Sequence, residues 1–274
     1  IEGFSDTAFA KGLALTIFGL ENPAQYIDER HEGLWQGAIN GMELAPEVQS
    51  YLIEKIRKIE ANDGVMSAIR YLSCMTSAEK KLILEWYRDG KIKKEDLKDL
   101  YPDLYYYLGK TVASSEEPWV LDYIDKYKEA KVRNEYTSDV RSYIISKNQN
   151  HVEYFKWSSK FPTSRTLLSM RQDIQAFIWI DGLGIDWIPF IAQIVKEHEP
   201  EGYYLNEVFV ATAKLPTRTD INKVDIEAMS GGLAVKIGDI DEVAHTCRPY
   251  PRFVIEDMVE VRNKIHKMLL EHPG

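Results

Sequence analysis

The segment Gln175-Ala-Phe-Ile-Trp-Ile180, followed at once by Asp181-Gly182, decides the predicted fold. It is a short, continuous apolar run that ends in a turn signal, which is typical of a strand buried on both faces of a parallel sheet. A helical pattern over residues 186–198 follows, and residues 207–213 predict the next strand. Strand, helix and strand at this spacing predict a βαβ unit and therefore an α/β fold.

Two local features support the predicted helix over residues 186–198, and a second helix closes the chain. Asp186 is a plausible N-cap, and Pro189 would lie in the tolerated first turn. Residues 253–270 form a clear amphipathic pattern and predict a long helix.

The residues before position 165 follow a helical period instead. Residues 46–60 place Val48, Leu52, Ile56 and Ile59 on one stripe. Thr76-Ser-Ala-Glu79 has the form of a capping box, and Gly90 supplies a C-terminal stop. Residues 115–120 start another helix, whose pattern runs to about residue 148. The predicted organisation is therefore a helical domain over residues 1–165 and an α/β domain over residues 166–274.

Composition excludes several classes of protein. With 45% hydrophobic and 28% charged residues among 274, the chain can bury a sizeable core. The formal net charge of -9 disfavours a non-specific DNA coat protein but leaves room for a local basic groove. Only two cysteines are present, which favours a reducing compartment, and we expect a cytoplasmic protein. Because no apolar run is long enough to span a bilayer, no membrane segment is predicted.

Three features could carry chemistry. Asp181 at a strand end suits a metal ligand and equally well a helix cap. Thr217 and Thr219 lie in Leu215-Pro-Thr-Arg-Thr-Asp220, where a hydroxyl activated by a cation could act as a nucleophile, although an ordinary turn explains the loop by itself. Asp241 and His245 are four positions apart, so on a helix their side chains would lie on one face. They could be ligands of one cation or a solvent-facing pair. Asp239 is a nearby alternative to Asp241 as the carboxylate ligand.

The order of these features is more informative than any one of them. A strand-end Asp-Gly, a Pro-Thr-x-Thr loop, an Asp-x-x-x-His motif and a long helix together resemble the alkaline phosphatase superfamily. The Leu-Pro-Thr-x-Thr loop, with a helical region before the Asp-Gly strand, looks most like the PglZ-domain family known from BREX phage-defence systems. The resemblance covers residues from about 150 to 274 and implies a partial alkaline-phosphatase-like parallel sheet with flanking helices.

The resemblance also implies a two-metal site. Asp181 and Thr219 would be metal ligand and nucleophile at one cation, and Asp241 and His245 would be ligands of the other. Thr217 is the alternative nucleophile, and Arg218 could meet a phosphate oxygen. Zinc is the first expectation for a mixed carboxylate and imidazole set, and manganese the second.

The family pattern continues with an Asp-His-Gly motif and a further His, which complete both metal sites, whereas this sequence stops at Gly274. We therefore expect the 274 residues to hold about half of the site, to bind metal weakly or not at all, and to be inactive as a fragment.

The implied activity is metal-assisted hydrolysis of a phosphomonoester or phosphodiester through a Thr nucleophile. The implied setting is bacterial phage defence, with other defence-system proteins as partners and a phosphate-ester or nucleic-acid substrate. One alternative is a helical protein-interaction module carrying a catalytically silent α/β scaffold. A phosphate mutase is a further alternative, whereas a sulfatase is disfavoured because the loop has neither Cys nor Ser at the nucleophile position.

Overall fold

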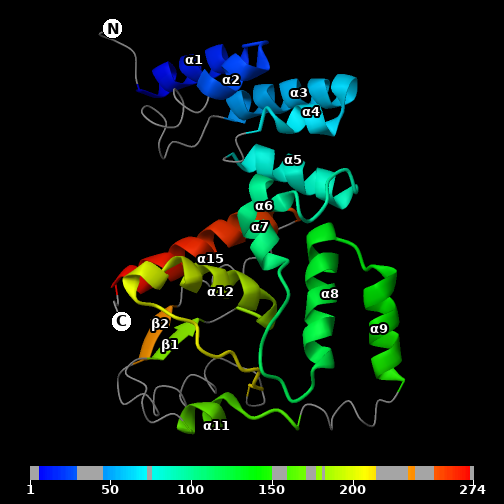
Figure 1. Cartoon of the computed structure of the whole chain (residues 1–274), viewed down its shortest axis with the longest axis vertical. Helices are drawn as coiled ribbons and strands as arrows, with labels where there is room; N and C mark the ends of the chain where they lie inside the picture. The colour runs from blue at the N-terminus through cyan, green and yellow to red at the C-terminus, as the bar shows by residue number, and fades with distance from the viewer. Residues whose placement is uncertain are drawn as a thin grey trace. The chain divides into compact units, whose positions relative to one another are not determined.

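The structure is a computed structural model of residues 1–274 (Figure 1). It describes residues 6–29, 46–72, 76–149, 159–170, 177–180, 183–213, 234–237 and 250–271. The chain divides into two compact units, Ile1–Pro102 and Asp103–Gly274, called here the N-terminal and C-terminal units. The boundary predicted at residue 165 thus falls inside the C-terminal unit, where helices from both sides of it pack together.

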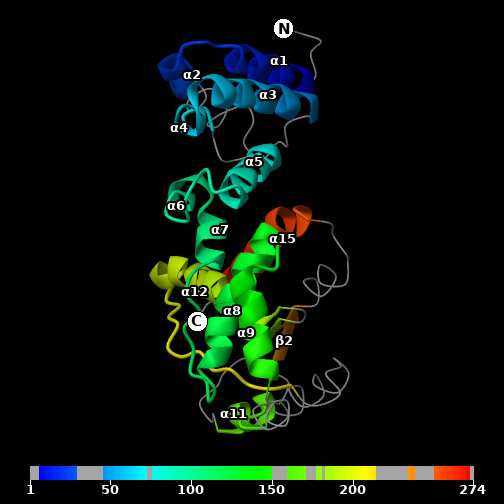
Figure 2. The same ribbon diagram turned by 90° about the vertical axis from the view of Figure 1, so that its right-hand side faces the viewer.

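The regular elements in the described part of the N-terminal unit are all helices. Its helices are α1 (Asp6–Phe18), α2 (Pro23–Glu29), α3 (Pro46–Asp63), α4 (Val65–Ile69), α5 (Ser77–Arg88) and α6 (Leu97–Leu100). Figure 2 shows α1 and α3 lying along one another. The predicted stripe of α3 is confirmed, since Val48, Leu52 and Ile56 are buried.

The start and end of α5 are confirmed as well. Thr76 caps the helix and forms the reciprocal capping box with Glu79. At the other end, Gly90 follows the C-cap residue with φ of 71°, a left-handed conformation that glycine adopts without strain.

The C-terminal unit is built mainly from helices. They are α7 (Pro102–Tyr107), α8 (Trp119–Arg133), α9 (Ser138–Asn148), α11 (Ser164–Ser169), α12 (Ile188–Glu197) and α15 (Arg252–Glu271), with short 3-10 turns η2 (Ile185–Trp187) and η3 (Glu199–Glu201). The predicted closing helix is therefore confirmed. No helix among the described ranges combines the length and apolarity that a membrane crossing needs.

The helix predicted from about residue 115 to 148 is two helices. Asn134 ends α8 in a left-handed conformation, with φ of 53°, and Thr137 caps α9 by accepting a hydrogen bond from the Val140 amide. Because both signals occur within four residues, the chain reverses there, and α8 and α9 pack side by side (Figures 1 and 2).

The α/β prediction is wrong for the part of the chain that the structure describes. Helices dominate it, and its strands are β1 (Phe177–Ile180) and β2 (Ala234–Ile237), of four residues each. These two pair in parallel, with Phe177 opposite Ala234 and Ile180 opposite Ile237. Among the described residues of 166–274, the β1–β2 pair stands in place of the predicted partial alkaline-phosphatase-like sheet.

The strand predicted over residues 207–213 is also wrong. That segment makes only two isolated bridges, Phe209 with Ser114 and Thr212 with Thr163. Phe209 is 45% exposed, so its ring is not part of a buried strand face. The second strand is instead β2, which the sequence pattern did not indicate.

The core of the C-terminal unit lies between α12 and α15. Phe190 and Ile194 of α12 are buried, as are Val261 and Ile265 of α15. Arg262 of α15 reinforces this contact with ion pairs to Glu197 at 2.5 Å and to Asp103 at 2.7 Å, and its aliphatic stem carries the guanidinium over the Phe190 ring.

Candidate functional site

The residues predicted to carry chemistry lie outside the described residues. They are Asp181, Thr217, Arg218, Thr219, Asp241 and His245. What the structure does describe is the chain immediately before two of them: β1 ends at Ile180, directly ahead of Asp181, and β2 ends at Ile237, ahead of Asp241 and His245.

The described connection after β1 runs from Leu183 to Trp187 and turns into α12 through η2. A Cβ on Gly184 would lie 2.4 Å from the Asp186 Oδ1 atom, so a larger residue at position 184 would require the Asp186 side chain to shift. Pro189 lies in the first turn of α12, as predicted. The N-cap of α12 is Trp187 rather than Asp186, and no side chain caps the helix.

Asp186 is buried, with 6% of its surface exposed, and makes other contacts than the predicted cap. Its Oδ2 atom accepts a hydrogen bond from the Tyr107 hydroxyl at 2.7 Å and from the Lys131 ammonium at 2.9 Å. A buried carboxylate without partners is costly, so a cation and a phenol in contact with it provide the needed stabilisation.

Aromatic rings surround the ammonium group of Lys131. The Nζ atom lies 5.9 Å from the ring centroids of Tyr107 and Tyr127 and 5.8 Å from that of Trp187. Tyr107 and Trp187 also meet edge to face, with centroids 5.1 Å apart. The rings attract the cation through their quadrupoles and limit the positions open to it.

The electrostatics of this cluster keep Tyr107 neutral. Burial raises the pKa of the Tyr107 phenol far above its ordinary value of 10.0, and the negative charge of Asp186 raises it further. Tyr107 therefore acts as a hydrogen-bond donor to Asp186 across the ordinary pH range. We call Tyr107, Lys131 and Asp186 the anchor cluster.

Sequence reasoning missed the anchor cluster. Lys131 and Tyr107 lie 55 and 79 positions from Asp186 in the chain, so no local spacing links them. The one available signal was a second acidic residue, Asp186, close behind Asp181 in the same connection.

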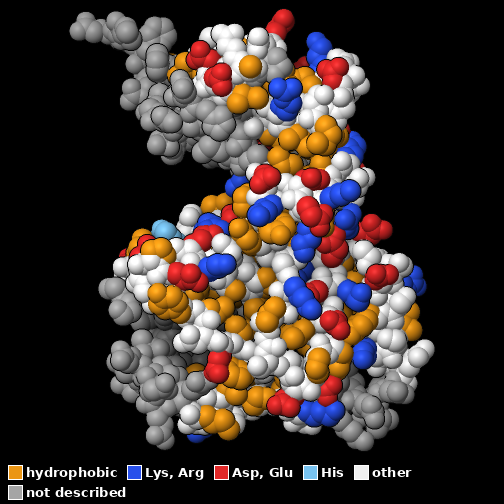
Figure 3. All heavy atoms as spheres, in the orientation of Figure 1, with side chains coloured by type: hydrophobic (Ala, Val, Ile, Leu, Met, Phe, Trp, Pro, Cys, Tyr) orange, Lys and Arg blue, Asp and Glu red, His pale blue; other side chains and the backbone are white. Residues whose placement is uncertain are grey.

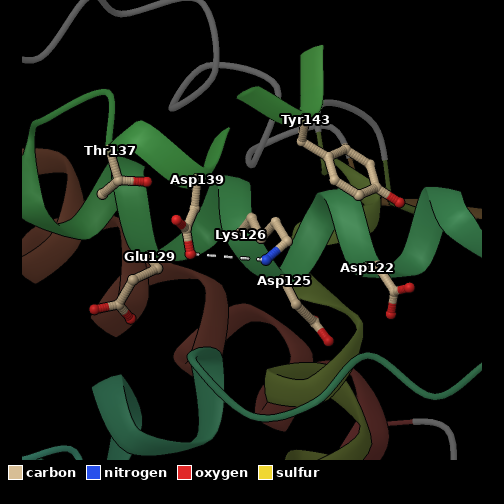
Figure 4. A pocket seen from close by; sticks show the side chains of 7 residues that line it. All are labelled: Asp122, Asp125, Lys126, Glu129, Thr137, Asp139 and Tyr143. Carbon is tan, nitrogen blue, oxygen red and sulfur yellow. Dashed lines mark ion pairs between the residues drawn. The ribbon is translucent and has the colours of Figure 1, made fainter. Parts of the chain in front are cut away.

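A cavity of about 510 Å³ opens between α8 and α9 (Figure 4). Its lining consists of Asp122, Asp125, Lys126, Glu129, Thr137, Asp139 and Tyr143. Lys126 lies 4.0 Å from Asp139 and reduces the negative charge of the cavity, as Figure 4 shows. Asp125 accepts a hydrogen bond from Thr111 at 2.7 Å and pairs with the buried Lys128 at 2.9 Å. These contacts hold the segment before α8 against the helix.

Basic and acidic side chains are intermingled over α8 and α9 on the face seen in Figure 3. This distribution gives that face no continuous positive field of the kind that non-specific nucleic-acid binding requires.

His198 and His266 form a pair. The Nε2 atom of His198 lies 2.8 Å from the Nδ1 atom of His266, and His198 is 3% exposed. Within the described ranges, no group of three or more His, Cys, Asp or Glu residues could hold a metal ion. The pair therefore fits a shared hydrogen bond between α15 and the end of α12.

No family model matches this chain, and neither a curated protein nor a solved structure matches it.

Proposed function

We propose that this protein is a metal-dependent phosphoesterase in which Thr219 is the nucleophile. Asp181 and Thr219 would hold one divalent cation, and Asp241 and His245 the other. A set of carboxylate, hydroxyl and imidazole donors fits zinc first and manganese second. The order of the Asp-Gly, Pro-Thr-x-Thr and Asp-x-x-x-His motifs along the chain is the basis of this assignment.

The parallel pairing of β1 with β2 supports the proposal. Ile180 lies opposite Ile237, so the carboxyl ends of the two strands are at the same edge. Asp181 follows the first strand directly, and Asp241 with His245 follows the second. Ligands in parallel arrangements gather beyond the carboxyl ends of strands, and both motifs come after strands that end at this edge.

Hydrolysis of a phosphate ester by this route requires a hydroxyl as nucleophile, a cation that orients it and an alkoxide as the leaving group. A bound divalent cation lowers the pKa of a coordinated hydroxyl and neutralises phosphate charge. The Thr219 oxygen would give its proton to solvent water and form a bond to phosphorus while the bond to the leaving oxygen breaks, and the leaving alkoxide would take up a proton from solvent. Water then hydrolyses the phosphothreonine and releases phosphate or a phosphomonoester. Arg218 would donate a hydrogen bond to a phosphate oxygen during both steps.

The direct test replaces the nucleophile in the protein at its natural full length. We expect Thr219→Ala to reduce hydrolysis of bis-p-nitrophenyl phosphate and p-nitrophenyl phosphate, assayed with Zn²⁺ or Mn²⁺, to background. Thr219→Ser keeps a hydroxyl and should retain part of the rate, and Thr217→Ala should retain most of it.

Equal activity of wild type and Thr219→Ala would show that the hydrolase proposal is wrong and would favour a helical protein-interaction module. Loss of activity in Thr217→Ala alone would move the nucleophile to that residue. Trapping of a phosphorylated Thr219 peptide by mass spectrometry after acid quenching would support the covalent step.

The proposal includes a cellular setting: bacterial phage defence in the cytoplasm, beside other defence-system proteins and with a phosphate ester or nucleic acid as substrate. This setting rests on the PglZ resemblance. A strain in which Thr219→Ala abolishes protection against phage, while the variant protein accumulates normally, would support it. Unchanged protection would contradict it.

A further inference from the structure

We propose that the hydrogen bond between His198 and His266 makes the attachment of the C-terminal end of α15 sensitive to acid. The bond holds while the pair carries at most one added proton, and it is lost when both imidazoles are charged. The inference is independent of the proposed function, because it concerns the packing of α15 and involves none of the residues assigned to the metal site.

The first support is the place of the pair in the fold. His198 ends α12 and precedes η3, and His266 lies on α15. The Nε2 atom of His198 is 2.8 Å from the Nδ1 atom of His266, and the Tyr203 hydroxyl donates a hydrogen bond to the Leu269 carbonyl at 2.7 Å. Both bonds join residues 198–203 to the C-terminal part of α15, so the loss of one weakens the attachment of that end.

The second support is the chemistry of a bond between two imidazoles. Such a bond needs a hydrogen on one facing nitrogen and a bare lone pair on the other. The neutral pair meets this condition, and so does a pair with one added proton, in which the charged imidazole donates to the neutral one. A second added proton must go to the accepting nitrogen. Both facing nitrogens then carry hydrogen, and two positive charges lie side by side, which breaks the bond.

The third support is the difference between the two environments. His198 is 3% exposed, whereas His266 is an exposed residue of α15. Within the described ranges, the buried Nδ1 atom of His198 has no hydrogen-bond partner, and the Glu201 Oε2 atom lies 3.7 Å from it. A first charge on His198 would therefore face a carboxylate. The exposed His266 can turn into water when it takes the second proton, and it then leaves the buried ring behind.

The other charged groups near the pair do not compensate a second charge. The titratable neighbours from α12, from residues 199–203 and from α15 are Glu197, Glu199, Glu201, Tyr203, Arg262 and Lys267. Glu197 pairs with Arg262 at 2.5 Å, and Lys267 pairs with Glu271 at 3.7 Å. A charge on His266 would lie one helical turn from Arg262 and next to Lys267, and this proximity of like charges adds to the cost.

The sign of the pH dependence follows from the second proton. In the unfolded chain the two imidazoles take up protons independently, whereas in the folded protein the second proton costs the bond. The folded state then binds fewer protons than the unfolded state, so the stability that the bond contributes is present near neutral pH and is lost toward about pH 5. The apolar packing of α12 on α15 carries no proton and should persist.

The experiment compares wild type, His266→Asn and Tyr203→Phe in the protein at its natural full length. Hydrogen exchange with mass spectrometry gives protection factors for peptides covering residues 198–204 and 262–271, corrected for the intrinsic exchange rate at each pH. We expect wild type to lose protection about fivefold between about pH 7.5 and about pH 5, as the loss of one hydrogen bond implies. His266→Asn keeps a polar partner that takes no proton, so its protection should not change with pH.

Tyr203→Phe is the matched control, because it removes the neighbouring bond between the same two segments but leaves the imidazoles in place. It should lower protection at both pH values and keep the acid loss of wild type. A second variant, His198→Phe, fills the buried position with an apolar ring and should show no acid loss. Equal protection of wild type at both pH values would overturn the inference. An acid loss in His266→Asn and His198→Phe as large as that of wild type would also overturn it, since other groups would then be the cause.

Discussion

Tyr107 shows how one side chain links burial to pH dependence. Tyr107 is 1% exposed, and its hydroxyl donates a hydrogen bond to the Asp186 carboxylate. Burial first and the Asp186 charge second raise the pKa of this phenol in the folded protein, whereas in the unfolded chain it keeps its ordinary value of 10.0. A raised pKa means that the contribution of Tyr107 to stability is fully present below about pH 10 and is lost as the pH rises beyond that value.

We therefore expect the substitution Tyr107→Phe to have a pH-dependent effect. At neutral pH the variant loses a buried hydrogen bond and about 1–3 kcal/mol of stability. The difference from wild type should shrink as the pH rises from about 9 to about 11, because phenylalanine has no proton to lose. Urea unfolding followed by tryptophan fluorescence measures both values.

The control for this prediction is Tyr105→Phe, a partly exposed tyrosine on the same helix. It should change stability little at any pH. A difference between wild type and Tyr107→Phe that stays constant from neutral to alkaline pH would contradict the assigned cause.

At the scale of elements, the start of α5 depends on a reciprocal pair of hydrogen bonds. The Glu79 amide donates to the Thr76 hydroxyl oxygen at 3.2 Å, and the Thr76 amide donates to the Glu79 carboxylate at 3.1 Å. Glu79 is fully buried, and the Thr76 amide and hydroxyl both donate to its carboxylate, which water does not reach. The capping box was predicted from four letters of sequence because both partners lie within one helical turn.

We expect Thr76→Ala to destabilise the N-terminal unit by about 1–2 kcal/mol, since it removes the cap and one donor to buried Glu79. Chemical denaturation with circular dichroism at 222 nm gives the value. Ser50→Ala in α3 is the control, because the Ser50 hydroxyl only returns a hydrogen bond to the Pro46 carbonyl on an exposed face. An equal effect of the two substitutions would contradict a capping role for Thr76.

At the scale of the whole molecule, the proposed metal site links ligand binding to folding. Only the folded chain brings the ends of β1 and β2 to one edge, so a cation bound there would favour the folded state. A ligand whose free concentration is about one hundred times its Kd adds about 2.7 kcal/mol to the free energy of unfolding. That increase is large enough to be seen in a thermal melt.

Accordingly, added Zn²⁺ or Mn²⁺ should raise the melting temperature of the full-length protein, and EDTA should reverse the rise. Asp181→Asn should abolish the shift, because a neutral amide is a poorer ligand than a carboxylate. Asp139→Asn is the control, since Asp139 is an exposed carboxylate beside Lys126 and far along the chain from the motifs. A metal-induced shift that survives in Asp181→Asn would place the cation elsewhere.

Local patterns predicted the helices better than the strands, although β1 confirms the strand predicted over residues 175–180. The α3 stripe, the Thr76 cap and the closing helix were correct because each depends on residues three or four positions apart, which one helix face brings together. Residues 207–213 carried a strand pattern that the fold did not use, and β2 carried little pattern of its own. Strand formation depends on a partner elsewhere in the chain, which local letters do not specify.

The sequence by itself determined the buried stripe of α3, both ends of α5 and the closing helix α15, and it supplied the ordered motifs on which the phosphoesterase proposal rests. Only the tertiary structure decided that β1 pairs with β2, and that Asp186 is joined to Lys131 and Tyr107 instead of capping α12. The physical reason is separation along the chain: caps and helical stripes are settled between near neighbours, whereas a buried carboxylate takes its partners from whichever distant segments the packing of the core brings beside it.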